Sequence, residues 1–297
     1  MNEQITDFEM YLLTEKRAPQ STTSAYIQDI KQYASFLQSR SVGLGTSTIA
    51  EVKQFLALLK NSGMSARSMA RKISSIKVFF SWAHERYQWH NYAIELTTPK
   101  LPQRLPTYLT NAEVDELLAA TQRDTTNLGI RNKVIVYLLY VSGMRISELV
   151  GLKRSSIHGN EYITVEGKGG KQRIIPLPEL MFTMLYEYLA TSHKMFTELH
   201  GDSDYIFPVI YGKKIKPISR QACWIILRDL CKTTSIDRPV SPHQLRHSLA
   251  THLLKNGADL RSLQLLLGHE NITTVEIYTH LDTTHLRTVY NKKHPRS

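Results

Sequence analysis

The stretch "HQLRHSLATHLL", residues 243–254, holds three histidines and one arginine but no acid. His243 and His247 are four residues apart, a spacing that places two imidazoles on one face of a helix. A zinc site of this spacing needs a further N, O or S ligand and often a nearby Glu. Arg246, which lies inside the pair, instead repels a metal ion, and its planar fork suits two phosphate oxygens. The stretch therefore favours an anion site, and a surface helix rich in histidine is the alternative.

A second cationic candidate lies in "LYVSGMRISELVGLK", residues 139–153. Gly143 is predicted to end an apolar helix, and Arg145 to open the next one. Backbone N–H groups at the start of a helix attract anions, so Arg145 is a candidate phosphate clamp. An exposed arginine without a function is the alternative. We expect Glu148 to support the helix or to orient a neighbour rather than to act as a base.

The segment "EYITVEGKGGKQRIIPL", residues 161–177, predicts a β-hairpin. Two β-rich runs flank "GKGGK", whose glycines permit the positive φ that a tight turn requires. Lys168 lies in this turn and could reach a bound ligand. A solvated turn lysine is the alternative, and Lys171 competes for the same role.

The segment "GHENITTVEIYTHL", residues 268–281, contains His269 at a predicted helix end and Tyr278 nine residues later. A tyrosine with its ordinary pKa near 10 is a poor nucleophile at pH 7 unless cations or a base activate it. Read alone, Tyr278 is more simply a packing residue, since the chain has 15 tyrosines.

Read together, these side chains predict phosphodiester chemistry. Arginines would neutralise the non-bridging oxygens, histidines would orient the phosphate and move protons, a lysine would protonate the leaving oxygen, and a tyrosine would attack. The sequence has no P-loop motif and no acid cluster that could hold magnesium. Fixed cations would then stabilise the transition state. We expect neither a metal nor a cofactor.

Composition limits the class of protein. A chain of 297 residues has room for two domains. It has no apolar run of about 18 residues that could span a membrane, and its polar, acidic beginning is unlike a signal peptide. Cys223 and Cys231 are eight residues apart in a predicted helix, and about 12 Å of helical rise excludes a disulfide. We expect a cytoplasmic protein.

The net charge of +11 is spread along the chain. Residues 1–104 hold 13 Lys and Arg against 8 acids, and residues 105–297 hold 24 against 18. Two basic parts favour an extended polyanion that contacts both. A merely basic surface is the alternative.

Hydrophobic spacing predicts a small bundle of four helices over residues 1–97. Thr6 with Glu9 and Thr48 with Glu51 have the spacing of capping boxes. In the fourth helix, Met69, Ile73, Ile76 and Phe80 share one face. The other face carries the basic residues that we predict to bind DNA: Arg67, Arg71, Lys72 and Lys77.

A proline-rich basic linker is predicted over residues 98–108, where three prolines stiffen the chain. Its Lys100 and Arg104, with Lys171 of the hairpin, complete the predicted DNA-binding set. Residues 109–297 mix helices with the hairpin and the short apolar run "DYIFPV". The predicted fold is mainly α with a small β-hairpin or sheet: a helical bundle followed by an α+β catalytic domain.

The order and spacing of these boxes resemble the tyrosine recombinase (λ-integrase-type) family, and within it the XerC/XerD-like recombinases. The resemblance covers essentially the whole chain, with residues 1–97 similar to the SAM-like core-binding domain and residues 109–297 to the catalytic domain. The boxes "SGMRISELVGL", "GKGGKQRIIPL", "SPHQLRHSLATHLLKNGADL" and "LLGHENITTVEIYTH" supply the family's catalytic set: Arg145, Lys168, His243, Arg246, His269 and Tyr278.

The resemblance implies a reaction. Tyr278 attacks the scissile phosphate and forms a 3′-phosphotyrosyl link. Arg145 and Arg246 hold the non-bridging oxygens with help from His269. Lys168 acts as the general acid for the leaving 5′-oxygen, and His243 assists proton transfer. His247 falls outside this set and is expected to buttress its helix, and neither ATP nor metal is needed.

The resemblance also implies partners. Four subunits, of this chain alone or with a second recombinase, would act on two double-stranded DNA recombination sites through a Holliday junction. A C-terminal tail of roughly residues 283–297 would dock on a neighbouring subunit. Resolution of chromosome or plasmid dimers is the expected role in chromosome partition, cell division and the cell cycle, with a DNA translocase at the division septum as a candidate partner.

Three other functions stay open from the sequence. Integration or excision of a mobile element uses the same chemistry, but mobile-element integrases often carry an added N-terminal arm-binding domain. About 104 residues precede the catalytic part here, which favours the Xer-like role. A type IB-like topoisomerase and a non-catalytic DNA-binding regulator are the remaining alternatives.

Overall fold

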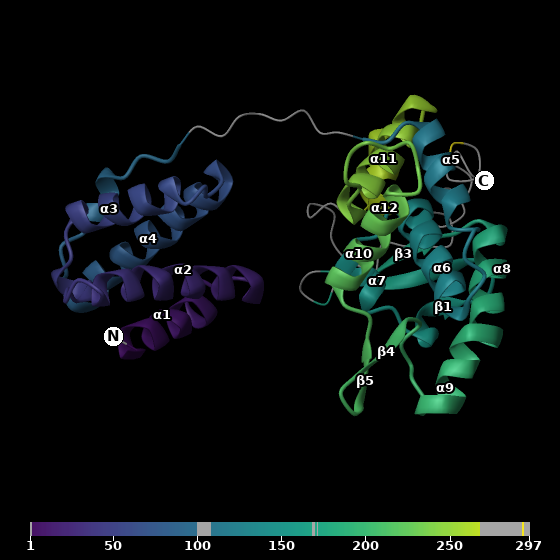
Figure 1. Cartoon of the computed structure of the whole chain (residues 1–297), viewed down its shortest axis with the longest axis horizontal. Helices are drawn as coiled ribbons and strands as arrows, with labels where there is room; N and C mark the ends of the chain where they lie inside the picture. Colours follow the sequence, from purple (N-terminus) through teal and green to yellow (C-terminus); the bar gives the residue numbers. More distant parts are fainter. Residues whose placement is uncertain (1, 100–107, 168–169, 171, 268–292, 294–297) are drawn as a thin grey trace. The chain divides into compact units, whose positions relative to one another are not determined.

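The structure is a computed structural model that describes residues 2–99, 108–167, 170, 172–267 and 293. The chain folds into two compact units, residues 1–104 and 105–297 (Figure 1). Both units are mainly helical, and the described strands all belong to the second unit. The predicted fold class, mainly α with a small β component, is therefore confirmed.

The first unit is a bundle of four helices with two short 3-10 turns. Its elements are α1 (Asn2–Thr14), α2 (Gln20–Gln38), η1 (Leu44–Thr46), α3 (Ile49–Asn61), α4 (Ala66–Tyr87) and η2 (Tyr92–Glu95). The core between them is largely aromatic. Phe8 of α1 meets Phe79 of α4 edge to face, with ring centroids 5.2 Å apart. The face of α4 predicted from its spacing (Met69, Ile73, Ile76 and Phe80) is buried as expected.

The helix starts show which local signals are reliable. Thr48 caps α3 with the predicted box, because its backbone N–H donates to Glu51 Oε2 at 2.7 Å and its hydroxyl accepts from the backbone of Ala50. The box predicted at Thr6 is wrong, since α1 already begins at Asn2 and Thr6 lies inside it.

A buried carboxylate joins two helices of the first unit. Asp29 of α2 is 1% exposed and accepts from Lys72 Nζ at 2.7 Å and from Arg71 Nη1 at 2.5 Å. Lys72 also donates to Gln32. Lys72 is only 3% exposed. Its ammonium therefore neutralises Asp29 inside the bundle, which corrects its placement on the basic face of α4.

The second unit contains the remaining helices and all the described strands. Its elements are α5 (Asn111–Ala120), α6 (Asn127–Ser142), α7 (Ile146–Val150), η3 (Arg154–Ser156), β1 (Ile157–His158), β2 (Tyr162–Glu166), β3 (Gln172–Pro176), α8 (Glu179–Tyr188), the π-helical turn η5 (Leu189–His193), α9 (Lys194–His200), β4 (Pro208–Tyr211), β5 (Lys214–Pro217), α10 (Arg220–Cys231), α11 (Pro242–Lys255) and α12 (Leu260–Leu267).

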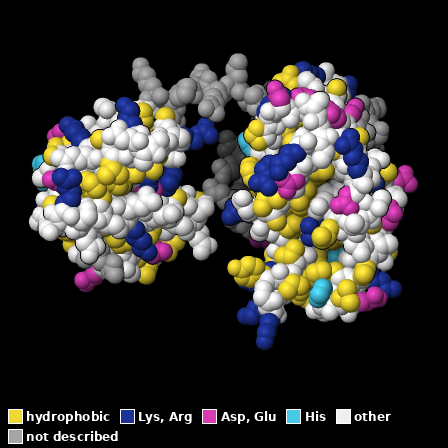
Figure 2. All heavy atoms as spheres, viewed as in Figure 1, with side chains coloured by type: hydrophobic (Ala, Val, Ile, Leu, Met, Phe, Trp, Pro, Cys, Tyr) yellow, Lys and Arg dark blue, Asp and Glu magenta, His cyan; other side chains and the backbone are white. Residues whose placement is uncertain are grey.

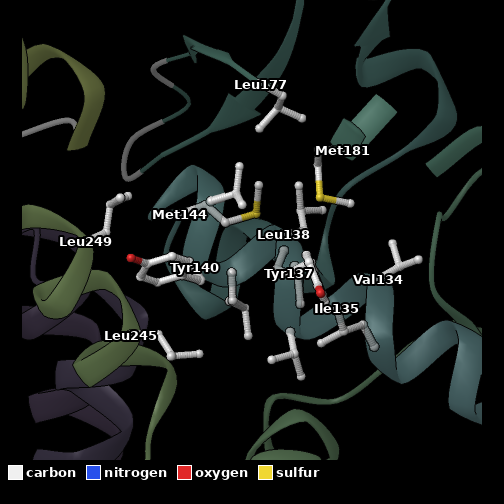
Figure 3. Packing of buried hydrophobic residues seen from close by; sticks show 14 of the residues in the cluster. Val134, Ile135, Tyr137, Leu138, Tyr140, Met144, Leu177, Met181, Leu245 and Leu249 are labelled. Atoms are coloured by element: carbon white, nitrogen blue, oxygen red, sulfur yellow. The ribbon is translucent and has the colours of Figure 1, made fainter. Parts of the chain in front are cut away.

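Helix α6 forms the centre of the second core. Every residue from Val134 to Ser142 is buried, as expected for a helix that is apolar on all sides. Figure 3 shows Leu138 and Tyr140 of α6 among side chains from other elements, including Met181 of α8 and Leu245 of α11. Packing on all sides holds α6 in place, so its C-terminal end is a firm platform for the residues that follow.

The predicted hairpin is present. Strands β2 and β3 pair antiparallel, with Val165 opposite Arg173 and Glu166 opposite Gln172, and β1 adds a third strand beside β2. The run "DYIFPV" contributes only its last residues to β4. Its partner β5 was not predicted, because three of its four residues are lysine or proline.

The two cysteines are free and buried, as their spacing predicted. None of the helices in the described ranges is long and apolar enough to cross a membrane. Lys and Arg side chains lie on the visible face of both units (Figure 2), in keeping with the positive charge of both parts of the sequence.

Replacing Asp29 with alanine should lower the free energy of unfolding of the first unit by about 3–5 kcal/mol, because it leaves the ammonium of Lys72 buried without its counter-charge. Denaturant titration followed by fluorescence in a Trp224→Phe background would report on this unit, which holds the other tryptophans. Glu9→Ala, which removes an exposed acid, should change stability by less than about 0.5 kcal/mol. Equal effects of the two variants would contradict the role of Asp29.

Candidate active site

Arg145 is positioned by the sharp end of α6. Gly143 ends that helix with φ +59, and a Cβ there would approach Leu249 and Leu267 to 2.8 and 2.9 Å. The chain therefore needs glycine both for the left-handed conformation and for the close packing. Arg145 follows as the N-cap of α7, and its side chain is 42% exposed.

The start of α7 is closed by its own acid. The backbone N–H of Arg145 donates to Glu148 Oε2 at 2.7 Å, and Arg145 Nη1 donates to Glu148 Oε1 at 3.1 Å. The helix has five residues. Glu148 thus takes one backbone N–H at the start of this helix, that of Arg145 itself. The guanidinium of Arg145 remains the candidate clamp, and Glu148 orients it as expected.

Among the described residues, Arg246 is held by backbone carbonyls rather than by a carboxylate. It lies on α11, is 8% exposed, and donates from Nη1 to the carbonyl oxygen of Gly143 at 2.6 Å. Its Nη2 donates to the carbonyl oxygen of Leu267 at the end of α12. A guanidinium has more N–H donors than these two contacts use. Arg246 can therefore be fixed by the protein and still bind an anion.

A third arginine completes the cluster. Arg173 of β3 makes a two-pronged ion pair with Glu148, Nη1 to Oε1 at 2.6 Å and Nη2 to Oε2 at 2.7 Å. Its Nε donates to the carbonyl oxygen of Leu266 at 3.3 Å. Sequence analysis missed Arg173 as part of the site. The signal was available, since strand alternation places Arg173 on the same face as the buried Ile175.

The pKa values of Arg246 and Glu148 are shifted by their burial and by the charges around them. Burial, followed by repulsion from Arg145 and Arg173, lowers the pKa of Arg246 to about 10, and Glu148 opposes that shift. Burial alone would raise the pKa of Glu148. Arg173 and then Arg145 outweigh this effect and hold it below the ordinary value. The cluster therefore sets three guanidinium groups against one carboxylate.

The end of α12 is tied to this cluster. The last carbonyls of a helix lack intrahelical partners and lie at the negative end of its dipole, where cations are favourable. Leu266 and Leu267 present such carbonyls to Arg173 and Arg246. The last described residues of α12 therefore contact the arginine cluster, and in the sequence His269 comes two positions after Leu267.

The histidines of α11 take different places. His243 is exposed in the first turn of the helix, and His247 is half-buried, with its ring edge-on to Tyr108 at 6.4 Å. His252 is buried, and its Nδ1 lies 2.9 Å from the hydroxyl of Tyr140. Burial lowers the pKa of His252. The contact with Tyr108 agrees with a packing role for His247.

The remaining predicted catalytic residues fall outside the described residues. Lys168 and Lys171 belong to the connection between β2 and β3, and His269 and Tyr278 follow α12. Lys100 and Arg104 of the predicted linker also fall outside. Their roles stay predictions.

The four basic residues of α4 that were predicted to bind DNA differ in exposure. Arg67 is exposed and Lys77 is half-buried, whereas Arg71 is exposed but also paired with Asp29. Lys72 is buried, as described above. The basic face of α4 available to a polyanion therefore consists of Arg67, Arg71 and Lys77.

A pocket of about 630 Å³ adjoins the cluster at Glu148. Glu148 and Ser147 of α7 line it, with hydroxyl and amide groups from η3, β2 and β3, including Ser155, Thr164 and Gln172. Within the part of the chain that the structure describes, no three His, Cys, Asp or Glu side chains are grouped to hold a metal ion.

Comparisons with known proteins identify the family. Residues 107–285 match the description "Phage integrase family", and residues 5–86 match "Phage integrase, N-terminal SAM-like domain". The chain therefore belongs to the phage integrase family, the tyrosine recombinases. It is a DNA-cleaving and DNA-rejoining enzyme, and DNA is its substrate.

Its relatives match from end to end. "Tyrosine recombinase XerD" of Listeria monocytogenes serotype 4b is 38% identical over 301 residues, covering 100% of both chains. The protein of the same name from Halalkalibacterium halodurans is 36% identical, covering 100% of this chain and 99% of its own. These values place the chain among Xer-like recombinases.

Solved structures share the fold. The XerH recombinase bound to difH has a TM-score of 0.67 at 21% identity, covering 90% of this chain and 76% of that one. A λ integrase dimer bound to a COC′ core site also gives 0.67 at 21% identity, covering 97% of this chain and 77% of that one.

Replacing Glu148 with glutamine should make stability less dependent on acid pH. A carboxyl whose folded pKa is lowered adds stability above its unfolded value near 4.3, and that stability is lost as the pH falls through the folded pKa. Between about pH 5 and pH 2, the free energy of unfolding of the second unit should therefore fall less steeply in Glu148→Gln than in the wild type. Urea titrations at stepped pH would measure both slopes.

The control is Glu161→Gln, an exposed acid beside β2, which should keep the wild-type slope. At pH 7, Glu148→Gln should itself cost about 3–5 kcal/mol, because two guanidinium groups lose their shared anion. Parallel acid profiles for wild type and Glu148→Gln would show that Glu148 is not held ionised by Arg173.

Proposed function

We propose that this chain is a site-specific tyrosine recombinase of the Xer type, which exchanges DNA strands through a 3′-phosphotyrosyl intermediate and a Holliday junction. The observation that carries the proposal is the arrangement of Arg145 and Arg246 around the end of α6. Both guanidinium groups are fixed by the protein, and both belong to one cluster with an excess of positive charge. Such a site stabilises the charge that develops on a phosphate under attack.

The proposed reaction is a pair of transesterifications. The Tyr278 oxygen attacks phosphorus, the bond from phosphorus to the 5′-oxygen breaks, and Lys168 gives that oxygen a proton. The phenolic proton leaves through His243 or water. Arg145 and Arg246 bind the non-bridging oxygens, with His269 beside them. Rejoining reverses these steps with a 5′-hydroxyl of the partner strand, so the ester conserves the bond energy and neither ATP nor metal takes part.

The proposed division of labour follows the two basic units. Residues 1–97 would act as the core-binding domain, with Arg67, Arg71 and Lys77 of α4 contacting phosphates. Residues 98–108 would be the linker, where Lys100 and Arg104 add charge. Residues 109–297 would form the catalytic domain, in which Lys171 supports DNA binding. Arginine and lysine contacts of this kind position a protein on DNA without reading its sequence.

The proposed assembly is a tetramer on two recombination sites, formed by this chain alone or with a second recombinase. Residues 283–297 would dock on a neighbouring subunit. The full-length likeness to proteins named XerD supports resolution of chromosome or plasmid dimers rather than integration of a mobile element. That role places the enzyme in the cytoplasm and makes a septal DNA translocase a candidate partner.

Replacing Tyr278 with phenylalanine should abolish covalent attachment while DNA binding persists, because only the attacking oxygen is removed. The measurement is a gel assay for the 3′ adduct on a suicide substrate nicked beside the cut. Tyr211→Phe, which changes an exposed tyrosine of β4, is the matched control and should keep the wild-type yield. An unchanged adduct yield with Tyr278→Phe would assign the nucleophile to another residue.

Replacing Lys168 with alanine should slow cleavage of an ordinary phosphodiester by about 100- to 10,000-fold, the usual contribution of a general acid. A substrate with sulfur at the 5′-bridging position should restore most of the rate, since a thiolate leaves without a proton. Lys171→Ala is the matched control: because its proposed role is DNA binding alone, it should cleave both substrates at the wild-type rate when DNA is saturating. Rescue of Lys171→Ala instead would transfer the acid role to that residue.

A further inference from the structure

Arg173 has a position in the cluster that goes beyond bracing a strand. It is buried and makes the shorter contacts on both Glu148 oxygens, 2.6 and 2.7 Å, whereas the Arg145 guanidinium has one contact of 3.1 Å on Oε1. The negative charge of Glu148 is therefore shared unequally. Most of it is neutralised by Arg173, and Arg145 is oriented by Glu148 without a two-pronged pair.

A carboxylate prefers a two-pronged pair with a guanidinium when one is available. Arg145 lies three residues from Glu148 on the same short helix, and its side chain is 42% exposed. Without Arg173, the Arg145 guanidinium could turn onto both Glu148 oxygens, and Glu148 would then neutralise its charge. With Arg173 in place, both oxygens are already taken by closer donors.

Arg173 also connects the elements that lead to the other predicted catalytic residues. It is the second residue of β3, and in the sequence it comes five positions after Lys168. Its Nε holds the carbonyl of Leu266, near the end of α12, after which the chain continues to His269 and Tyr278. One side chain thus contacts α7 and α12 from β3.

We propose that Arg173 is a positioning residue for phosphoryl transfer, which occupies Glu148 so that the Arg145 guanidinium stays directed to the scissile phosphate. Arg173 is not assigned to the phosphate itself, since its Nη1 and Nη2 donate to Glu148 and its Nε donates to the carbonyl oxygen of Leu266. The inference rests on the proposed function. It adds that the reactivity of Arg145 depends on competition between two arginines for one carboxylate.

The test uses the full chain and two suicide substrates, one with an ordinary phosphate and one with a methylphosphonate at the cut. The methyl group removes one negative charge, so a methylphosphonate depends less on arginine. Arg173→Met should slow adduct formation on phosphate by up to about 100-fold, the cost of a misplaced catalytic group. The loss on methylphosphonate should be clearly smaller, and DNA affinity should stay near the wild-type value.

The double variant Glu148→Gln/Arg173→Met separates competition from bracing. An amide cannot capture Arg145 as a carboxylate does, so the double variant should react faster on phosphate than Arg173→Met. If Arg173 only braces the fold, the double variant would be as slow or slower, and both substrates would lose rate equally. That result would overturn the inference.

Arg131→Met is the matched control, because it removes another partly buried guanidinium of the same unit, at the start of α6. It should keep the wild-type rate on both substrates. A wild-type rate for Arg173→Met would also overturn the inference. The proposed function would stand in that case, because the unmodified protein still forms the adduct. Absence of any adduct with the wild type would overturn the proposed function, and the inference with it.

Discussion

The Glu148 carboxylate, buried among guanidinium groups, is the constraint that organises the second unit. It closes the first turn of α7, fixes Arg145 and pairs with Arg173. Without it, the arginines would repel one another in a poorly solvated place, and burying such cations unpaired is expensive. One carboxylate joins a helix to a strand and leaves the group positive overall, which is the condition for holding a phosphodiester.

Backbone carbonyls, rather than Glu148, hold Arg246. Arg246 reaches no carboxylate among the described residues, and its guanidinium is instead satisfied by the carbonyls of Gly143 and Leu267. Carbonyl oxygens offer partial charge only, so Arg246 keeps its full positive charge for a ligand. This explains why Gly143 must be glycine. Its φ of +59 is strained for any other residue, and its carbonyl oxygen is one of the two that hold Arg246.

The sequence predicted the site where function depends on residue type and spacing, and failed where it depends on burial. The boxes around Arg145 and Arg246 could be recognised, as could the hairpin and the buried helix before Gly143. Lys72 was placed on a DNA-binding face because it lies beside Arg71 on the side of α4 away from the apolar residues. In the structure it instead pairs with the buried Asp29 of α2. Periodicity does not show which partner a second helix contributes.

Arg173 was overlooked for the same reason, since a basic residue in a short strand is ordinarily a solvated edge residue. Only the fold brings β3 against α7 and the end of α12. The ion pairs of Lys72 and Arg173, which the sequence did not reveal, have different roles. Asp29 pairs with two cations, Arg71 and Lys72, and joins two helices of a bundle. Glu148 lies among three arginines, and the larger excess of positive charge is what a reacting phosphate requires. The same kind of buried ion pair therefore serves packing in one unit and chemistry in the other.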